Sequence, residues 1–182
     1  MSNLAINKEY GNQREETKLF TYHQKSGYVG FIYAMIFVMI LESVGVSFLL
    51  YKWSPILHWI HLVLGILTII FLVFDLRAVV KNPIRIQENT LTLKIGSRPE
   101  YIVLIENVED IKNGNINYEN DKKSKDVLDL SLLGFDLPTF ELVLKEPVES
   151  KGNFGNRKMI KRIFLTVDDE QSFYRLIKNK ED

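Results

Sequence analysis

Two long apolar runs separated by a short polar break restrict the fold of this chain more than any other feature of its sequence. The first run, from Tyr28 to Leu50, has about 23 residues, and the second, from Ile56 to Phe74, has about 19. A helix needs about 20 apolar residues to cross the hydrocarbon core of a bilayer. Because only the break from Lys52 to Pro55 connects the runs, the two helices must be antiparallel neighbours. The sequence therefore predicts a transmembrane helical hairpin with spans over about residues 28–50 and 56–76.

The basic residues beside these runs predict the orientation of the hairpin. Lys and Arg are enriched in the cytoplasmic segments that flank membrane spans. Here they lie on the outer sides of the runs, as Lys18, Lys25, Arg77, Lys81 and Arg85, against Lys52 alone in the connection. We therefore expect a multi-pass protein of the cell (plasma) membrane with both termini in the cytoplasm. The first run does not fit a cleaved signal peptide, because about 27 polar residues precede it and no small-x-small cleavage site follows it.

Composition excludes several classes of function. The chain of 182 residues has no cysteine, which excludes disulfides, thiolate metal sites and thiol nucleophiles. From Arg77 to Asp182 about 18 basic residues are balanced by about 18 acidic ones, so this part of the chain lacks the excess positive charge that binds nucleic acid. The same part of the sequence has no histidine, no G-x-S-x-G motif and no phosphate-binding loop. We therefore expect neither enzymatic activity nor a cofactor.

Three ionisable residues interrupt the apolar runs and form a candidate intramembrane site: Glu42, His58 and His61. At about 1.5 Å per residue, Glu42 lies roughly 15 Å from the connection and His61 roughly 10 Å from it, so the side chains could meet. Ionisable groups at this depth are costly and usually face a partner or a cavity. Three interpretations stay open: a contact that holds the helices together, a proton-linked or substrate-contacting role, and a metal site with a thin ligand set. Gly30 and Ala34 form one pair of small residues with the spacing of a close helix contact, and Ser43 and Ser47 form another.

From residue 83 onward the apolar residues follow the periodicity of strands, which predicts a cytoplasmic domain over residues 83–182. Residues 1–26 are expected to form a polar cytoplasmic tail, and residues 27–80 contain the hairpin. Alternating apolar residues predict strands over 84–87, 91–95, 101–105, 128–132, 140–144 and 159–167, an irregular segment over 105–111, and loops over 113–126 and 147–156. Asp168 predicts the cap of a final helix that packs through Phe173, Leu176 and Ile177. The expected fold class is α+β, a helical hairpin followed by an antiparallel β-barrel or sandwich with a C-terminal capping helix.

Four segments of the domain occur in an order that is shared with a known family. Ile84 to Gly96 (IRIQENTLTLKIG) and Tyr101 to Lys112 (YIVLIENVEDIK) come first, and Phe140 to Ser150 (FELVLKEPVES) and Lys161 to Lys178 (KRIFLTVDDEQSFYRLIK) come last. This order resembles the opening strands, closing strands and capping helix of bacterial pleckstrin-homology-like (PH-like) domains. Many such domains are fused to paired transmembrane helices in Gram-positive bacteria. The resemblance implies a PH-like fold and a cytoplasmic address, and it implies no particular ligand.

Four basic residues beside the last predicted strand are candidates for contact with anionic lipid: Arg157, Lys158, Lys161 and Arg162. Solvated charges that protect a sheet edge are the alternative interpretation. The sequence favours a membrane protein that displays a PH-like interaction or scaffold module, with the lipid bilayer and another membrane protein as partners. The alternative is a small membrane enzyme or transport accessory that uses the three intramembrane residues.

Overall fold

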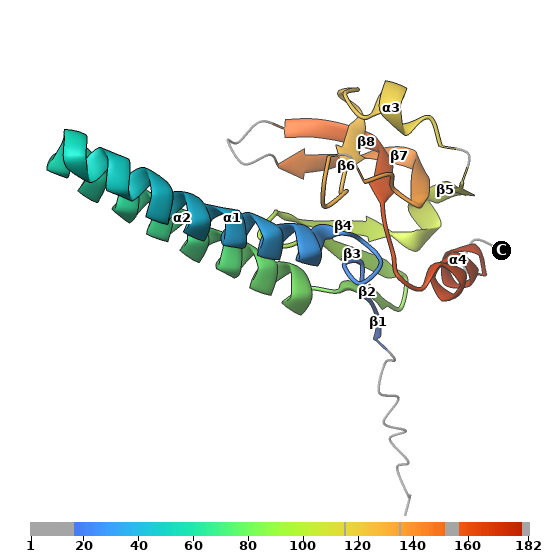
Figure 1. Ribbon diagram of the computed structural model, residues 1–182. Coiled ribbons are helices and arrows are strands. Elements are labelled where there is room, and N and C mark those ends of the chain that lie inside the picture. Colours follow the sequence, from blue (N-terminus) through green and yellow to red (C-terminus); the bar gives the residue numbers. More distant parts are fainter. Residues whose placement is uncertain (1–16, 115, 135, 152–156, 180–182) are drawn as a thin grey trace, which may run out of the picture.

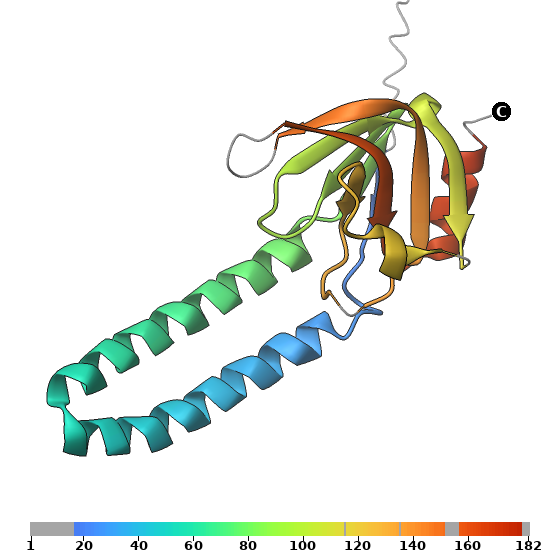
Figure 2. The same ribbon diagram turned by 90° about the horizontal axis from the view of Figure 1, so that it is seen from above.

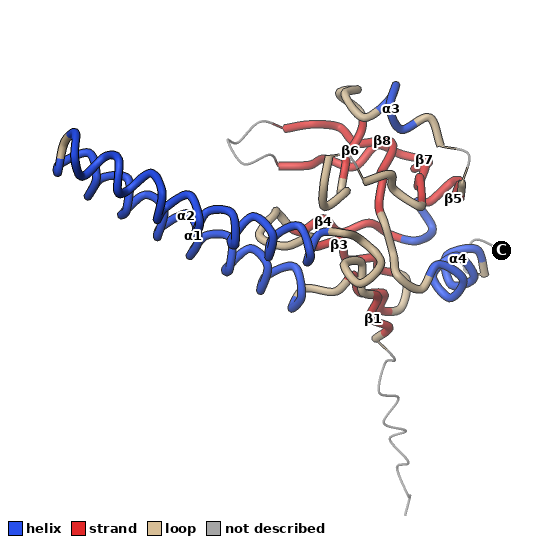
Figure 3. The backbone as a smooth tube through the Cα atoms, viewed as in Figure 1, coloured by secondary structure: helices blue, strands red, loops and turns tan. Residues whose placement is uncertain are grey.

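The computed structural model describes residues 17–114, 116–134, 136–151 and 157–179, and its fold class is α+β, as expected (Figures 1 and 3). Two long helices, α1 (Tyr28–Trp53) and α2 (Pro55–Lys81), form an arm that projects from the remaining structure, the domain. The strands are β1 (Lys18–Phe20), β2 (Ile84–Gln87), β3 (Thr90–Lys94), β4 (Glu100–Leu104), β5 (Val108–Asn113), β6 (Val127–Asp129), β7 (Phe140–Lys151) and β8 (Arg157–Leu165). The shorter helices are η1 (Ile105–Asn107), α3 (Tyr118–Asp121) and α4 (Glu170–Lys178).

The sequence accounts for the two arm helices and for the bend between them. Ser54 has an extended backbone, with φ of −154°, and Pro55 takes the first position of α2, where its missing N–H costs nothing. α2 ends at Lys81 because Pro83 disfavours a helical conformation in the residue before it. The predicted spans, residues 28–50 and 56–76, lie inside the two helices, which both continue for a few residues.

The arm helices contact each other along a narrow face and expose apolar side chains elsewhere. In α1 the half-buried residues recur every three or four positions, as Met39, Ser43, Ser47 and Leu50. Large apolar side chains cover the remaining surface; Phe37, Leu49 and Phe71, for example, are 62%, 66% and 64% exposed. A surface helix of a soluble protein has a polar face, which these helices lack. By length and composition both helices could cross a membrane, since 26 residues make about 39 Å of helix.

The described residues of the domain form two four-stranded sheets (Figure 2). The first has the strand order β1-β2-β3-β4 and is antiparallel. The second has the order β5-β7-β8-β6, in which β6 runs parallel to β8 and the other pairs are antiparallel. Inward-facing side chains of both sheets share one apolar core, which includes Leu91, Leu93, Leu142, Leu144, Ile163 and Leu165. α4 covers this core with Phe173 and Ile177, the face that its sequence predicts.

A strand lies within the segment that the sequence analysis assigned to a polar tail, so that assignment was wrong for residues 18–20. β1 pairs antiparallel with β2, with Phe20 opposite Ile84. Phe20 and Tyr22 are buried in the domain core. The segment is too short to show a strand period by itself, and its structure depends on a partner that comes more than 60 residues later. Residues 1–16 of the predicted tail lie outside the described residues.

Several element boundaries differ from the prediction. Residues 105–111, expected to be irregular, belong to η1 and β5, and the expected loop over 113–126 contains the one-turn helix α3. The strand expected over 128–132 is reduced to β6. β7 continues through Pro147, which the prediction placed in a loop. Its register against β8 shifts between Val143 and Val148, and a proline, which cannot donate a ladder hydrogen bond, is tolerated at such an irregularity.

Two adjacent aspartates at the start of α4 have different roles. Asp169, not the expected Asp168, caps the helix, because its carboxylate accepts a hydrogen bond from the Ser172 N–H at 3.2 Å. Asp168 instead accepts hydrogen bonds from the backbone N–H groups of Lys25 at 2.8 Å and Gln24 at 3.1 Å. It therefore ties the segment before α1 to the start of α4. Capping requires only a short polar side chain, so the sequence does not distinguish the two residues.

We predict that Asp168→Asn lowers stability at neutral pH and weakens its acid dependence. Burial raises the pKa of Asp168, but hydrogen bonds from Lys25, Thr21 and Gln24 outweigh burial and hold the pKa below its ordinary value. A lowered pKa in the folded state means that this stabilisation is complete above the ordinary pKa of about 3.9 and is lost as the pH falls through the folded value. The expected loss at pH 7 is about 1–3 kcal/mol.

Urea unfolding of the full chain in detergent micelles, followed by circular dichroism at neutral and acidic pH, measures both effects. Asp110→Asn is the matched control, because it makes the same substitution at an exposed carboxylate of β5. An acid dependence that is the same in Asp168→Asn and in the parent chain would contradict the assigned role.

Candidate functional site

The three candidate residues of the arm lie in different surroundings. Glu42 is exposed on α1. The Nδ1 atom of His58 lies 3.2 Å from the carbonyl oxygen of Ser47, and the imidazole packs edge-on against the Tyr51 ring with centroids 5.6 Å apart. His61 is half-buried, and its Nε2 atom is enclosed without a hydrogen-bond partner among the described residues.

The structure does not bring Glu42 together with the two histidines. In the part of the chain that the structure describes, neither an ion pair nor a hydrogen bond joins this carboxylate to an imidazole, and no cluster of three metal-ligating side chains occurs. Small residues form part of the helix contact, as the spacing of Ser43 and Ser47 predicts: a Cβ added to Gly65 would lie 3.4 Å from Ser43 Oγ. Gly30 and Ala34, the other predicted pair, are exposed. The metal site and the contact that holds the helices together both need the carboxylate near the imidazoles, so this geometry supports neither of these two interpretations. A proton-linked or substrate-contacting role does not need that contact and stays a prediction.

A polar junction centred on Asp75 holds the base of the arm against the domain. This residue of α2 accepts a hydrogen bond from the hydroxyl of Tyr28, the first residue of α1. Its other carboxylate oxygen accepts a hydrogen bond from the hydroxyl of Ser97, in the β3–β4 turn, at 2.9 Å. One side chain therefore connects both arm helices to the first sheet.

The same β3–β4 turn makes a second set of contacts with the arm. The N–H of Gly96 donates to the Tyr22 hydroxyl at 3.0 Å, and its carbonyl accepts from the Asn82 amide at 3.1 Å. Gly96 has a φ of +55°, and a Cβ at this position would lie 3.0 Å from Val79 Cγ2, so the turn can approach α2 only as glycine. Burial raises the pKa of Tyr22, which therefore stays protonated at neutral pH. These contacts give the domain a defined orientation relative to the arm.

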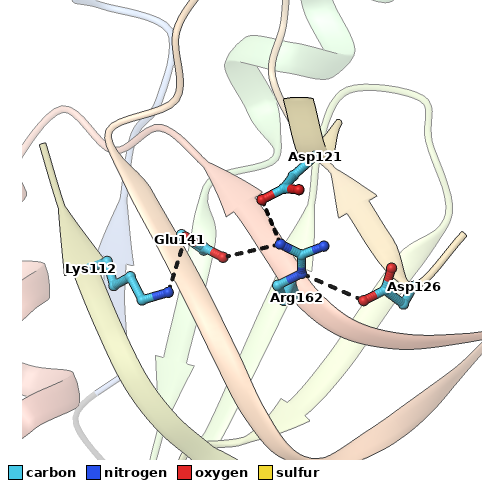
Figure 4. A network of polar contacts seen from close by, with 5 residues as sticks. All are labelled: Lys112, Asp121, Asp126, Glu141 and Arg162. Atoms are coloured by element: carbon cyan, nitrogen blue, oxygen red, sulfur yellow. Dashed lines mark hydrogen bonds and ion pairs between the residues drawn. The ribbon is translucent and has the colours of Figure 1, made fainter. Parts of the chain in front are cut away.

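A network of charged side chains crosses three strands of the second sheet (Figure 4). Glu141 of β7, with a side chain that is 5% exposed, lies 3.5 Å from Lys112 Nζ of β5 and 3.8 Å from Arg162 Nη1 of β8. Arg162 also lies 2.7 Å from the Asp121 carboxylate and 3.5 Å from that of Asp126. Burial lowers the pKa of Arg162, but the surrounding carboxylates raise it by more. The network therefore holds α3 and its connection against the sheet.

This network changes the set of residues that could contact anionic lipid. Arg162 does not fit that prediction, because three carboxylates already surround its guanidinium. Arg157 pairs with Glu149, with Nε and Oε1 3.1 Å apart, whereas Lys158 and Lys161 are exposed. The end of β7 and the start of β8 lie on the same side of the domain as the arm in both views (Figures 1 and 2). Lys158, near that end, is therefore the best placed of the four.

Neither the junction nor the charged network has a local signal in the sequence that predicts it. Their members come from segments that are far apart in the chain, so no local motif unites them. Glu141 offers a weak signal, since it stands between the buried residues Phe140 and Leu142. A charge inside such a strand suggests a partner on the next one, but only the strand order identifies Lys112 and Arg162 as those partners.

Comparison with known proteins finds no relative: no family model, no curated protein and no solved structure matches this chain.

Proposed function

We propose that this protein is a two-span integral protein of the plasma membrane that displays a PH-like interaction or scaffold module to the cytoplasm. The apolar surface around the whole arm carries this proposal. Monomeric soluble proteins rarely expose contiguous apolar patches of more than a few hundred Å², and exposure to water costs about 25 cal/mol per Å². Lipid removes this cost, and the backbone of a helix leaves no polar group for lipid to satisfy.

The arm differs from the two other common kinds of long apolar helix, the core helix of a soluble protein and the signal sequence. In a soluble protein such a helix belongs to the core, but the buried residues of the two arm helices are Tyr28, Ile32 and Val79, all near the domain. A signal sequence would be removed, but Ile32 is part of the domain core, and Tyr28 is bonded to Asp75. Both observations favour a hairpin that is retained as an anchor.

The shape of the arm bears on its orientation in the bilayer. Both of its ends lie at the domain, and the bend between its helices lies at the far end (Figure 2). A hairpin that crosses the bilayer therefore leaves the residues before α1 and after α2 on the same side. Lys25 and Lys81 lie at the domain end and Lys52 at the bend, and this distribution supports a cytoplasmic domain.

The domain supports a PH-like module at the level of architecture. Two sheets share one core, and a C-terminal helix covers it. Two features depart from the simple order of strands that the sequence suggested: β1 comes from before the hairpin, and β6 is parallel to β8. We assign the module an interaction role because it is a separate folded domain that polar contacts fix at the base of the arm.

Cysteine labelling tests the proposed topology, and the chain is suited to it because it has no native cysteine. Trp53→Cys places a thiol at the bend of the arm, and Asp110→Cys places one on the exposed side of β5. With a membrane-impermeant maleimide, we expect labelling of the first variant in intact cells and of the second only after permeabilisation. Labelling of Asp110→Cys in intact cells would contradict a cytoplasmic domain, and equal labelling of both variants would contradict a spanning arm.

Glu42 supports a partner within the membrane. It is exposed at mid-length of α1, where an ionisable side chain costs about 2.5–3.5 kcal/mol on insertion scales. A helix of another membrane protein that donates a hydrogen bond to this carboxylate would reduce that cost.

We predict that Glu42→Gln leaves membrane insertion and folding unchanged and reduces the amount of partner captured in mild detergent by at least about threefold. The capture experiment compares the full chain with the Glu42→Gln variant and with a chain that lacks Pro83 to Asp182. This comparison separates the contribution of the arm from that of the domain. Equal capture by the full chain and both variants would contradict a partner at either place.

A further inference from the structure

An open groove of about 490 Å³ lies between the edge of the first sheet and β7. One wall is β4, with the side chains of Ile102 and Leu104, which are 59% and 47% exposed. The other wall belongs to the part of β7 that precedes and includes Val148, where the register against β8 shifts. Asn107 fixes this second wall, because its side chain accepts from the Glu146 N–H and donates to the Glu146 carbonyl, both at 2.9 Å.

The backbone of β4 offers hydrogen-bonding groups to the open side of its sheet. β4 is an edge strand that pairs with β3, and the N–H of Ile105, just after it, donates to the carbonyl of Asn89 at 2.8 Å across the same register. Bonded and non-bonded residues alternate along an antiparallel pair, so Val103 also bonds to β3. Ile102 and Leu104 therefore direct their N–H and C=O groups away from β3, and no described residue bonds to them there.

The other three edges of the two described sheets have protection that β4 lacks. β1 and β6 have three residues each. β5 exposes the charged side chains of Glu109, Asp110 and Lys112, and its register shifts after Val108. Short strands, exposed charges and bulges are the means by which sheets avoid pairing with further strands. β4 has five residues in continuous register with β3 and no charge after Glu100, so it is the edge best suited to accept another strand.

A second copy of this chain does not fit the groove through its own β4. The strand begins after the turn that contacts the arm, and it leads away from the arm (Figure 2). In an antiparallel pair of β4 strands the two turns would lie at opposite ends, so the two arms would project in opposite directions. Two arms in one bilayer must project the same way. The occupant that fits is therefore a segment of another protein.

The groove also defines the side chains of such a segment. Successive residues of a strand point to opposite faces, so alternate apolar side chains of the segment can contact the apolar side chains of both walls. At the Leu104 end the lining has the carboxylates of Glu106 and Glu146 against one ammonium, that of Lys145, whose Nζ donates to the Glu106 carbonyl at 2.8 Å. Neither carboxylate forms an ion pair with a described residue. This excess negative charge suits a lysine or arginine of the segment.

We propose that β4 binds an extended segment of a partner protein, which adds a strand to the first sheet and has alternating apolar side chains and a basic residue near the Leu104 end. Its backbone bonds to the outward N–H and C=O groups of Ile102 and Leu104, and its side chains supply the specificity. The site deepens the proposed interaction role of the domain, and the cytoplasmic location of the partner rests on that proposed function.

A phage-displayed library of short random peptides, selected on the full chain in nanodiscs after depletion on empty nanodiscs, tests the site. We expect the selected peptides to alternate apolar residues and to carry lysine or arginine. When such a peptide binds, hydrogen exchange resolved to single amides should slow at Ile102 and Leu104 and stay unchanged at Val103, which already bonds to β3. Selection of no peptide, or protection that leaves out Ile102 and Leu104, would overturn the proposal.

Ile102→Pro removes one outward N–H and keeps the pairing with β3, because proline is tolerated on an edge strand where its nitrogen faces away from the sheet. We expect this variant to bind the selected peptide at least about tenfold more weakly than the parent chain. Ile102→Thr keeps the N–H and should lose about threefold, and Ile102→Val, the matched control, should bind like the parent. The midpoint of thermal unfolding shows that each variant is folded.

Two further results would overturn the proposal. One is equal affinity of Ile102→Pro and the parent chain for the peptide. The other is protection of Ile102 and Leu104 that appears without peptide and rises with protein concentration, since it would assign the groove to a second copy. Neither result would affect the anchored topology, which cysteine labelling tests independently.

Discussion

Replacing Arg162 by methionine is expected to lower the free energy of unfolding of the domain by about 3–5 kcal/mol. Methionine keeps much of the apolar stem but removes the guanidinium. Glu141 would then retain only Lys112, 3.5 Å away, and Asp121 would lose its ion-pair partner at 2.7 Å. The loss is large because Glu141 is almost fully buried, so its charge cannot be solvated by water in place of the missing arginine.

Arg157→Met is the matched control, because it makes the same substitution on the same strand. The side chains of Arg157 and Glu149 are 75% and 43% exposed, and an exposed ion pair contributes only about 0–1 kcal/mol. Urea unfolding of the two variants and the parent chain in detergent micelles measures the difference. Similar losses of stability in both variants would contradict a structural role for the buried network.

The sequence predicted those parts of the fold whose pattern of apolar residues is local and does not depend on contacts with distant segments of the chain. The arm follows from two long apolar runs, whose length and composition fit helices that could span a bilayer. β2 and β3 follow from the alternation of Ile84 and Ile86 and of Leu91 and Leu93, all of which are buried. The apolar face of α4 follows from the helical spacing of Phe173 and Ile177.

The parts that the sequence did not predict depend on contacts between distant segments. β1 exists because β2 supplies its hydrogen-bond partners, and β7 continues past Pro147 because β8 lies beside it. Asp168 was assigned to the helix beside it, but its partners lie more than 140 residues earlier. The depth of Glu42 in the arm could be estimated from the sequence, whereas the face of α1 on which it lies depends on how the two helices pack.

Phe173 joins three parts of the domain. Its ring is fully buried, with its centroid 5.4 Å from that of Phe20 in β1 and 5.4 Å from that of Phe140 in β7. We expect Phe173→Ala to lower the free energy of unfolding by about 3–5 kcal/mol, because the cavity it leaves opens on both sheets. Phe173→Leu, which fills part of that volume, should cost clearly less, and Gln171→Ala on the exposed face of α4 should change little.

Hydrogen exchange adds a local test of the same residue. If α4 holds β1 in place through the Phe20–Phe173 contact, the amides of β1 that pair with β2 should lose protection in Phe173→Ala more than those shared by β2 and β3. β1 has three residues at the edge of its sheet, so β2 alone offers few hydrogen bonds to retain it. Unchanged protection in β1 would mean that the strand is held by β2 and by the Asp168 hydrogen bonds to the segment before α1, and that α4 covers the core without supporting the edge.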